Sequence, residues 1–157
     1  MTHSLISFSH LAIAIVIPFI VAAIPSIWTH NFPDEWYWSL NRAPWTPPPW
    51  MFGVAWSIIY ICEGIASFLV YQTGGNVRLH LALYALTLCV TAMWPTVFFS
   101  WHMIKAATVH LFVILVLVIA LTIVFGRVQK TAAYFLLPFL IWISLANTLQ
   151  VYIFMHN

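Results

Sequence analysis

The residues of this chain that could do chemistry combine aromatic rings with a few polar groups inside long apolar runs. Trp56, Tyr60 and Glu63 follow one another at helical spacing, so they share one face of a predicted helix. An ionised carboxylate at mid-membrane depth is costly and usually points into a bundle or a cavity. Glu63 therefore has two readings: a protonated side chain hydrogen-bonded to a neighbouring helix, or a group that contacts a ligand or handles protons. By depth alone, His110 is its expected intramembrane partner.

Two further helix faces carry aromatic and polar or small side chains together. One face of the third predicted helix combines two hydroxyls with two rings: Thr87, Thr91, Trp94 and Phe98. The alternative there is plain interhelical packing, with the threonines bonded to their own backbone carbonyls. In the fifth predicted helix, Trp142 lies deep in the span, and Ala146 one turn later leaves room beside the indole. Such a tryptophan indicates a pocket or a helix contact rather than an anchor at the headgroups.

The elements that must position these residues are membrane helices. Of the 157 residues, 64% are hydrophobic and 5% are charged, whereas a soluble domain averages about 25% charged residues. Five apolar runs are long enough to span a bilayer, and continuous runs of this kind exclude a transmembrane barrel. We therefore predict an all-α integral membrane protein, a five-helix transmembrane bundle that forms one domain over residues 1–157. Its expected helices are 4–28, 49–71, 79–101, 105–125 and 131–155.

Residues 29–48 form the one long connection, and they are rich in Trp, Tyr and Pro. Trp and Tyr favour the headgroup level of a bilayer. A proline suits the first turn of a helix, so we expect the chain to enter the membrane at about Pro49. The segment is expected to fold back over the bundle as a lid. The tryptophans at span ends are expected to be anchors: Trp28, Trp36, Trp38 and Trp101.

Composition and spacing also argue against several functions. The formal net charge of +2 is too small and too scattered for a nucleic-acid surface. The seven histidines are scattered without ligand spacing, so we predict interfacial solvation for them and no metal site. No nucleophile–base pair, phosphate loop or dinucleotide fingerprint is present in the sequence.

Three motifs and one loop resemble those of the TspO/MBR family of tryptophan-rich sensory proteins and translocator proteins, once called peripheral benzodiazepine receptors. The motifs are Pro44-Trp45-x-Pro47-Pro48-x-Trp50, Trp94-Pro95-x-x-Phe98-Phe99 and Pro138-x-x-x-Trp142, and the loop is Pro33-Asp34-Glu35-Trp36-Tyr37. The match extends from about Pro33 to Tyr152. The resemblance implies a five-helix bundle, commonly dimeric, that binds porphyrins, sterols and benzodiazepine-site ligands. Its pocket would lie within the bundle, under the loop between the first two helices.

Carried over residue by residue, the resemblance implies a ligand site around two tryptophans, Trp56 and Trp142. In some bacterial members the corresponding residues are implicated in light-dependent porphyrin breakdown. Ala146 corresponds to a small residue that affects ligand fit, and Tyr37 lies in the lid loop. With the helix faces described above, the complete expected site is Tyr37, Phe52, Gly53, Ala55, Trp56, Tyr60, Glu63, Thr87, Thr91, Trp94, Phe98, Trp142 and Ala146.

The chain also departs from the family pattern. Thr87 and Thr91 stand where many members have a Gln and an Asn, and Glu63 stands where an uncharged residue is usual. Tyr152 lacks the following Lys or Arg of the sterol-associated pattern, so we expect weak sterol binding.

The resulting function hypothesis is a membrane protein that binds tetrapyrroles, such as protoporphyrin IX or haem, and similar flat apolar ligands, in sensing, regulation or tetrapyrrole homeostasis. The first alternative is a light-dependent porphyrin-degrading enzyme with Trp56 and Trp142 as reactive indoles. The second is a transporter of porphyrin or sterol, against which stands the lack of a visible internal repeat. The expected partners are the lipid bilayer, a tetrapyrrole and a second copy of the chain, with no required cofactor. The expected location is a bacterial membrane or the mitochondrial outer membrane.

Overall fold

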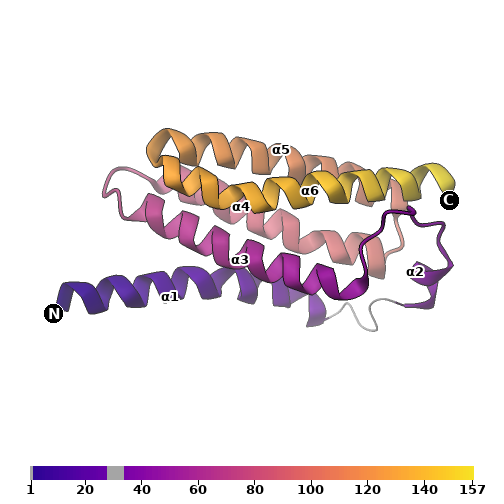
Figure 1. Cartoon of the computed structure of the whole chain (residues 1–157), viewed down its shortest axis with the longest axis horizontal. Helices are drawn as coiled ribbons and strands as arrows, with labels where there is room; N and C mark the ends of the chain where they lie inside the picture. Colours follow the sequence, from indigo (N-terminus) through magenta and orange to yellow (C-terminus); the bar gives the residue numbers. More distant parts are fainter. Residues whose placement is uncertain (1, 28–33) are drawn as a thin grey trace.

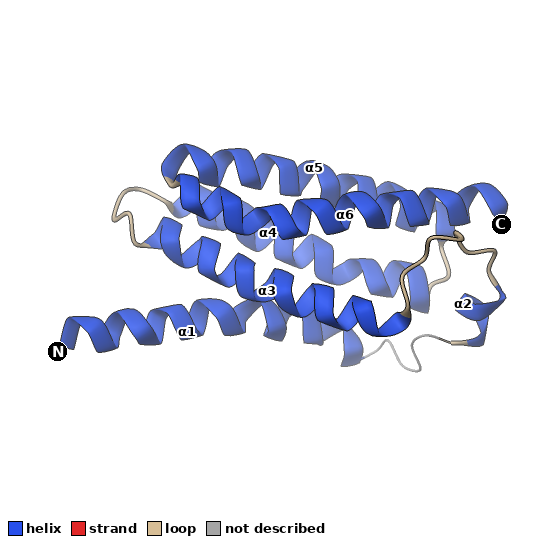
Figure 2. Ribbon diagram, viewed as in Figure 1, coloured by secondary structure: helices blue, strands red, loops and turns tan. Residues whose placement is uncertain are grey.

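The computed structural model describes residues 2–27 and 34–157, and in these ranges it is helical without strands. Five of its helices are long and apolar enough to cross a membrane, as Figures 1 and 2 show. They are α1 (Thr2–Ala23), α3 (Pro49–Tyr71), α4 (Arg78–Pro95), α5 (Ile104–Val128) and α6 (Lys130–His156). The prediction of an all-α membrane protein with five spans is confirmed.

The five long helices form a closed ring in which each helix has two principal neighbours. α3 packs on α1 and α6, α5 packs on α6 and α4, and α4 closes the ring against α1. The two ends of the chain lie at opposite ends of this bundle (Figure 1), as an odd number of spans requires. Buried apolar clusters fill the bundle at three places along its length.

Helices α1 and α3 approach each other closely at Gly64, which is buried. A Cβ atom at this position would lie 2.5 Å from the Cα atom of Ile15 and 2.7 Å from the carbonyl oxygen of Ala14. Small residues let membrane helices bring their backbones together, where dispersion contacts hold them. Glycine is therefore the residue that this crossing requires.

The third span is not one continuous α-helix, contrary to the expected helix 79–101. α4 ends at Pro95 and a π-helical turn, η2 (Thr96–Ser100), follows it. Pro95 has no N–H, so the carbonyl of Thr91 loses its helical donor and the next turn can widen. The backbone N–H of Trp101 closes this turn by donating to the carbonyl of Thr96 at 3.0 Å.

Two other helix ends differ from the expected ones. α1 stops at Ala23 and a 3-10 segment, η1 (Ile24–Ile27), carries the buried Pro25; residue 28 lies outside the described ranges. α5 continues past Gly126 to Val128, so the expected end at residue 125 was wrong. The apolar run ends at Gly126 and Arg127 in the sequence, but the backbone stays helical up to Val128, and Gln129 separates α5 from α6.

The described part of the expected lid contains a short helix, α2 (Glu35–Ser39), at the end of the bundle that carries the C-terminus (Figure 1). Asp34 is its N-cap, and one carboxylate oxygen accepts the backbone N–H of Tyr37 at 3.0 Å. The chain then runs across this end of the bundle and enters α3 at Pro49, the first-turn position that suits a proline.

Candidate functional site

Aromatic rings of α3 and α6 meet in two pairs where these helices pack together. Trp142 lies against Phe52, with ring centroids 5.3 Å apart and planes at 82°. Trp56 lies against Phe139 at 5.9 Å and 63°. Both arrangements are edge-to-face, a geometry that aromatic quadrupoles favour. We call these four residues and Tyr60 the indole cluster.

The indole cluster rests on a buried apolar base and reaches a third helix. Trp56 and Trp142 are half-buried, and both pack on the same buried group. Tyr60 stacks on Trp56 at 5.5 Å and meets Phe19 of α1 edge-to-face at 5.2 Å. Ala146 packs on the same base, one turn beyond Trp142. The base consists of Ile59, Leu111, Ile114, Val118, Phe139 and Ile143.

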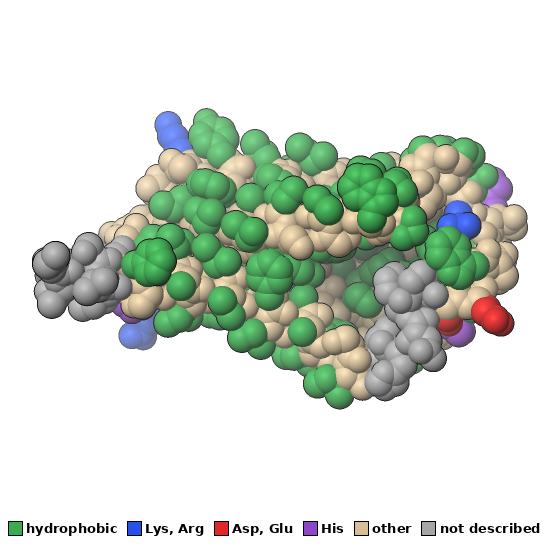
Figure 3. All heavy atoms as spheres, turned by 60° about the horizontal axis from the view of Figure 1, so that its bottom comes forward, with side chains coloured by type: hydrophobic (Ala, Val, Ile, Leu, Met, Phe, Trp, Pro, Cys, Tyr) green, Lys and Arg blue, Asp and Glu red, His purple; other side chains and the backbone are tan. Residues whose placement is uncertain are grey.

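The start of α3 leaves space beside this cluster. Gly53 is exposed, and a Cβ atom there would meet nothing within 4 Å. Ala55 is half-buried. The molecular surface is hollowed towards the end of the bundle that carries α2, with hydrophobic side chains around the recess (Figure 3).

The aromatic residues of the third span join α4 to α5. The indole N–H of Trp94 donates to the carbonyl of Ala107 at 3.2 Å, and its ring stacks on Phe98 at 5.1 Å. The Nε2 atom of His110 lies 2.8 Å from the carbonyl oxygen of Val90 and forms a second bridge between the same helices. Phe98 is buried, whereas Trp94 also touches the base of the indole cluster. Trp94 therefore joins α4 to α5, and Phe98 extends this packing into η2.

The two threonines of α4 differ in their hydrogen bonding. Thr87 is buried and its hydroxyl donates to the carbonyl of Leu83 at 2.8 Å, which is the packing alternative considered above. Thr91 is also buried, but its hydroxyl has no partner among the described residues. An unsatisfied buried hydroxyl costs about 1–3 kcal/mol.

Glu63 does not pair with His110, so that prediction was wrong. Its side chain is 1% exposed, and Oε1 has no hydrogen-bond partner in the described ranges. His110 instead contacts the Val90 carbonyl of α4, because α4 and not α3 is a principal neighbour of α5 in the ring. The carboxyl group is thus enclosed without a cationic partner among the described residues.

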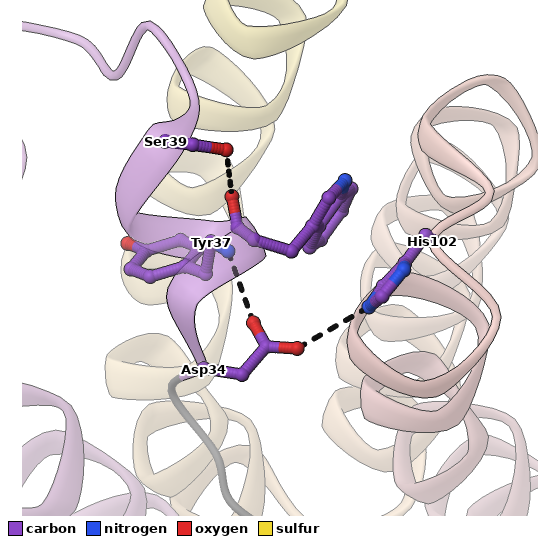
Figure 4. Close-up of polar contacts among 5 residues, drawn as sticks. Asp34, Tyr37, Ser39 and His102 are labelled. Carbon is purple, nitrogen blue, oxygen red and sulfur yellow. Dashed lines mark hydrogen bonds and ion pairs between the residues drawn. The ribbon is translucent and has the colours of Figure 1, made fainter.

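An ion pair and a ring stack hold α2 over η2 (Figure 4). Oδ2 of Asp34 lies 3.3 Å from Nε2 of His102, and the Trp36 indole stacks on the imidazole at 4.0 Å and 16°. His102 has φ +52°, an uncommon value for a residue with a side chain. We call Asp34, Trp36 and His102 the loop clamp. Solvation alone, as predicted for the histidines, does not describe His102.

Further contacts fasten the rest of this loop. The Tyr37 ring meets Phe99 at 5.6 Å, and the Arg42 guanidinium lies 5.3 Å from the centre of the Tyr37 ring. The side-chain amide of Asn41 donates to the carbonyl of His156 at 3.0 Å. The loop therefore contacts η2 on one side and the end of α6 on the other, and covers the bundle between them. We call its described part, residues 34–48, the roof.

The structure thus divides the expected site residues into groups. Four of them gather on one base, Trp56, Tyr60, Trp142 and Ala146, and Phe52 joins them through its contact with the Trp142 ring. Tyr37 and Phe98 belong to the adjacent aromatic group under α2, and Trp94 touches both groups. Asp34 and His102 were not expected to meet; they lie far apart in the sequence, and neither has a local pattern that could indicate the pair.

Comparison with known proteins identifies the family. A family model described as the TspO/MBR family matches residues 14–156. A tryptophan-rich sensory protein of Cereibacter sphaeroides is 34% identical over 118 residues, which are 75% of this chain and 74% of that protein. A tryptophan-rich protein TspO of Chlorobaculum tepidum is 31% identical, covering 80% and 82%, and the human translocator protein is 29% identical, covering 85% and 82%. The chain belongs to the TspO/MBR family and is a multi-pass integral membrane protein.

Proposed function

We propose that this protein binds a tetrapyrrole, or a flat apolar ligand of similar size, against the indole cluster. The observation that carries the proposal is the meeting of Trp56 from α3 and Trp142 from α6 on one apolar base. Both rings are half-buried rather than enclosed, so each has ring surface left to offer to a ligand. A porphyrin presents a broad π face of its own, which suits offset stacking on an indole.

The chemistry of the surroundings supports an apolar ligand. The base beneath the two indoles is entirely hydrophobic, and burying apolar surface contributes about 25 cal/mol per Å² before the costs of association. Binding pockets for small molecules usually add a small number of polar groups that fix orientation. Tyr37 and Arg42 of the roof supply such groups at the membrane-surface end, where the propionates of a porphyrin would need a cation.

Recruitment of the ligand requires a route past the roof. The loop rests on η2 through the loop clamp and on α6 through Asn41. The described contacts between roof and bundle are side-chain contacts rather than a continuous backbone ladder. We expect the roof to move away from the bundle as one unit when a ligand enters, while α3 and α6 remain in place.

The experiment is a titration of the detergent-purified protein with protoporphyrin IX, followed by the absorbance band of the porphyrin. An aromatic contact contributes roughly 0.5–1.5 kcal/mol beyond its area. Trp56→Phe and Trp142→Phe should therefore each weaken the affinity by about 2- to 10-fold. Trp101→Phe is the matched control, because Trp101 is 58% exposed and lies outside the cluster.

Two outcomes are decisive. If the original protein, the Trp56→Phe, Trp142→Phe double variant and the control bind protoporphyrin IX with equal affinity, the indole cluster is not part of the binding site. Illumination of the same complex separates binding from light-dependent breakdown: decay of the porphyrin band faster than in detergent alone, and slowed in the double variant, would assign the indoles a reactive role.

A further inference from the structure

A second hollow lies between α1, α3 and α4, away from the indole cluster. Its volume is about 410 Å³, within the range of about 300–1,000 Å³ that is usual for small-molecule pockets. None of the indole-cluster residues lines it. The greater part of its wall is aliphatic or aromatic, including Ile13, Ile17, Val21, Phe68, Leu81 and Leu88. We call it the α1 groove.

The α1 groove has the length of one lipid leaflet. Its lining on α1 begins at His10 and ends at Val21, a separation of ~16 Å along a helix axis at 1.5 Å per residue. The hydrocarbon core of a bilayer is about 30 Å thick, so half of it is about 15 Å. The groove therefore runs from one membrane surface to near the midplane.

The groove is open to the bilayer rather than enclosed. Ile13 is 57% exposed and Ile17 is 42% exposed, so the α1 wall faces the lipid. Only four of its lining side chains are polar, His10, Ser67, Tyr71 and Tyr84, and the Tyr84 hydroxyl is buried without a partner among the described residues. The hydroxyl of Ser67 is already donated to the carbonyl of Gly64 at 2.9 Å. A flexible hydrocarbon chain is the occupant that such a wall suits.

The membrane-surface end of the groove is cationic. Arg78 begins α4 and is exposed, and it lies on the same helical stripe as Leu81 and Ala85, which line the groove. The rings of His10 and Tyr71 meet edge-to-face at 5.8 Å at the same end. Basic and histidine side chains are visible at this end of the bundle (Figure 3).

No acidic side chain offsets this charge. Arg127 and Lys130 lie at the same end, where α5 joins α6. The chain has three acidic residues: Asp34 and Glu35 lie in the roof at the opposite end, and Glu63 is buried in α3. Basic residues at a membrane surface attract anionic lipids at about 1 kcal/mol each.

We propose that the α1 groove binds one acyl chain of an anionic phospholipid from the leaflet at its end of the bundle, with the lipid phosphate beside Arg78. The chain fills the apolar wall and the basic residue selects the headgroup. The site is separate from the proposed tetrapyrrole site and does not depend on it.

Native mass spectrometry of the protein released from mixed micelles tests this, with phosphatidylglycerol and phosphatidylcholine of identical acyl chains as the probes. The expected result is a retained lipid with a preference for phosphatidylglycerol. Arg78→Gln should lower that preference about fivefold, the factor that corresponds to ~1 kcal/mol, while leaving the chain bound. Arg127→Gln is the matched control, because it removes a charge at the same end without touching the groove.

A second pair of variants tests the groove itself. Ala85→Phe fills it and should abolish retention of both lipids, whereas Ala82→Phe, at an exposed position of the same helix outside the lining, should not. Cys89 lines the groove, so phosphatidylglycerol should slow its alkylation in the original protein but not in Ala85→Phe. Equal lipid retention in Ala85→Phe and Ala82→Phe would overturn the proposal. So would a dimer signal that Ala85→Phe removes without any bound lipid, since the groove would then be covered by a second copy.

Discussion

Gly64→Ala is the substitution that most directly tests the packing of α1 on α3. A Cβ atom at this position would lie 2.5, 2.7 and 2.8 Å from three backbone atoms of Ala14 and Ile15. Carbon atoms in contact prefer separations of about 3.5–4.0 Å. The backbone of α1 would therefore have to retreat by about 1 Å, and no side-chain rotation can relieve the clash.

The size of the effect follows from what this retreat disrupts. Adding a methylene-sized group to a well-packed contact costs about 1–3 kcal/mol. The gain in helix propensity from Gly to Ala, at most about 1 kcal/mol, largely cancels, because membrane helices stay helical when they separate. Gly64→Ala should therefore lower the free energy of unfolding by about 1–3 kcal/mol.

The measurement is a denaturation titration in mixed micelles containing a denaturing detergent, followed by the fluorescence of the tryptophans, which reports packing rather than helix content. Gly53→Ala is the matched control for stability, because it makes the same chemical change in the same helix where a Cβ meets nothing within 4 Å. Its midpoint should stay within error of the original. Adding Ile15→Ala to Gly64→Ala should not restore stability, since the clash is with backbone atoms.

The reasoning about the helix crossing fails if Gly64→Ala and Gly53→Ala unfold at the same detergent concentration. It fails equally if Ile15→Ala rescues Gly64→Ala, because the obstacle would then be a side chain.

Substitutions at two further positions, Trp94 and Asp34, test contacts that hold the bundle and its loop together. Trp94→Phe removes the N–H that donates to Ala107 and should cost about 0.5–1.5 kcal/mol in the same titration, with the exposed Trp101→Phe as the control; equal stabilities would show that the bond contributes nothing. Asp34→Asn should speed amide hydrogen exchange in α2 moderately, because Asn still caps a helix but cannot form the ion pair with His102. Asp34→Ala should speed this exchange further, and identical rates for the two variants would mean that the ion pair does not hold the roof.

The number and type of the spans could be predicted because they depend on composition and run length alone. The runs that became α3 and α6 are continuous and apolar, so their helical state follows from the need to satisfy backbone groups in lipid. The position of Trp56 and Tyr60 on one face of α3 could also be predicted, since side chains four residues apart share a helix face.

Contacts that depend on how helices turn towards one another could not be predicted. His110 was predicted to pair with Glu63 because the two residues lie at a similar depth in the membrane. In the structure α5 packs against α4 rather than α3, and His110 contacts the Val90 carbonyl. The pair between Asp34 and His102 depends on a positive φ at His102 and on the fold of the loop, and neither has a periodic pattern in the sequence.

The π turn at Thr96–Ser100 sets the angular position of everything that follows it in the third span. Such a turn holds one residue more than an α-helical turn, so winding the same five residues as a regular α-helix would carry the chain one residue further around the axis. The segment beyond would then rotate by about 100° around the helix axis and shift by about 1.5 Å. The imidazole at position 102 would then point away from the carboxylate that it now meets at 3.3 Å. The π winding of Thr96–Ser100 therefore keeps the roof attached to the bundle.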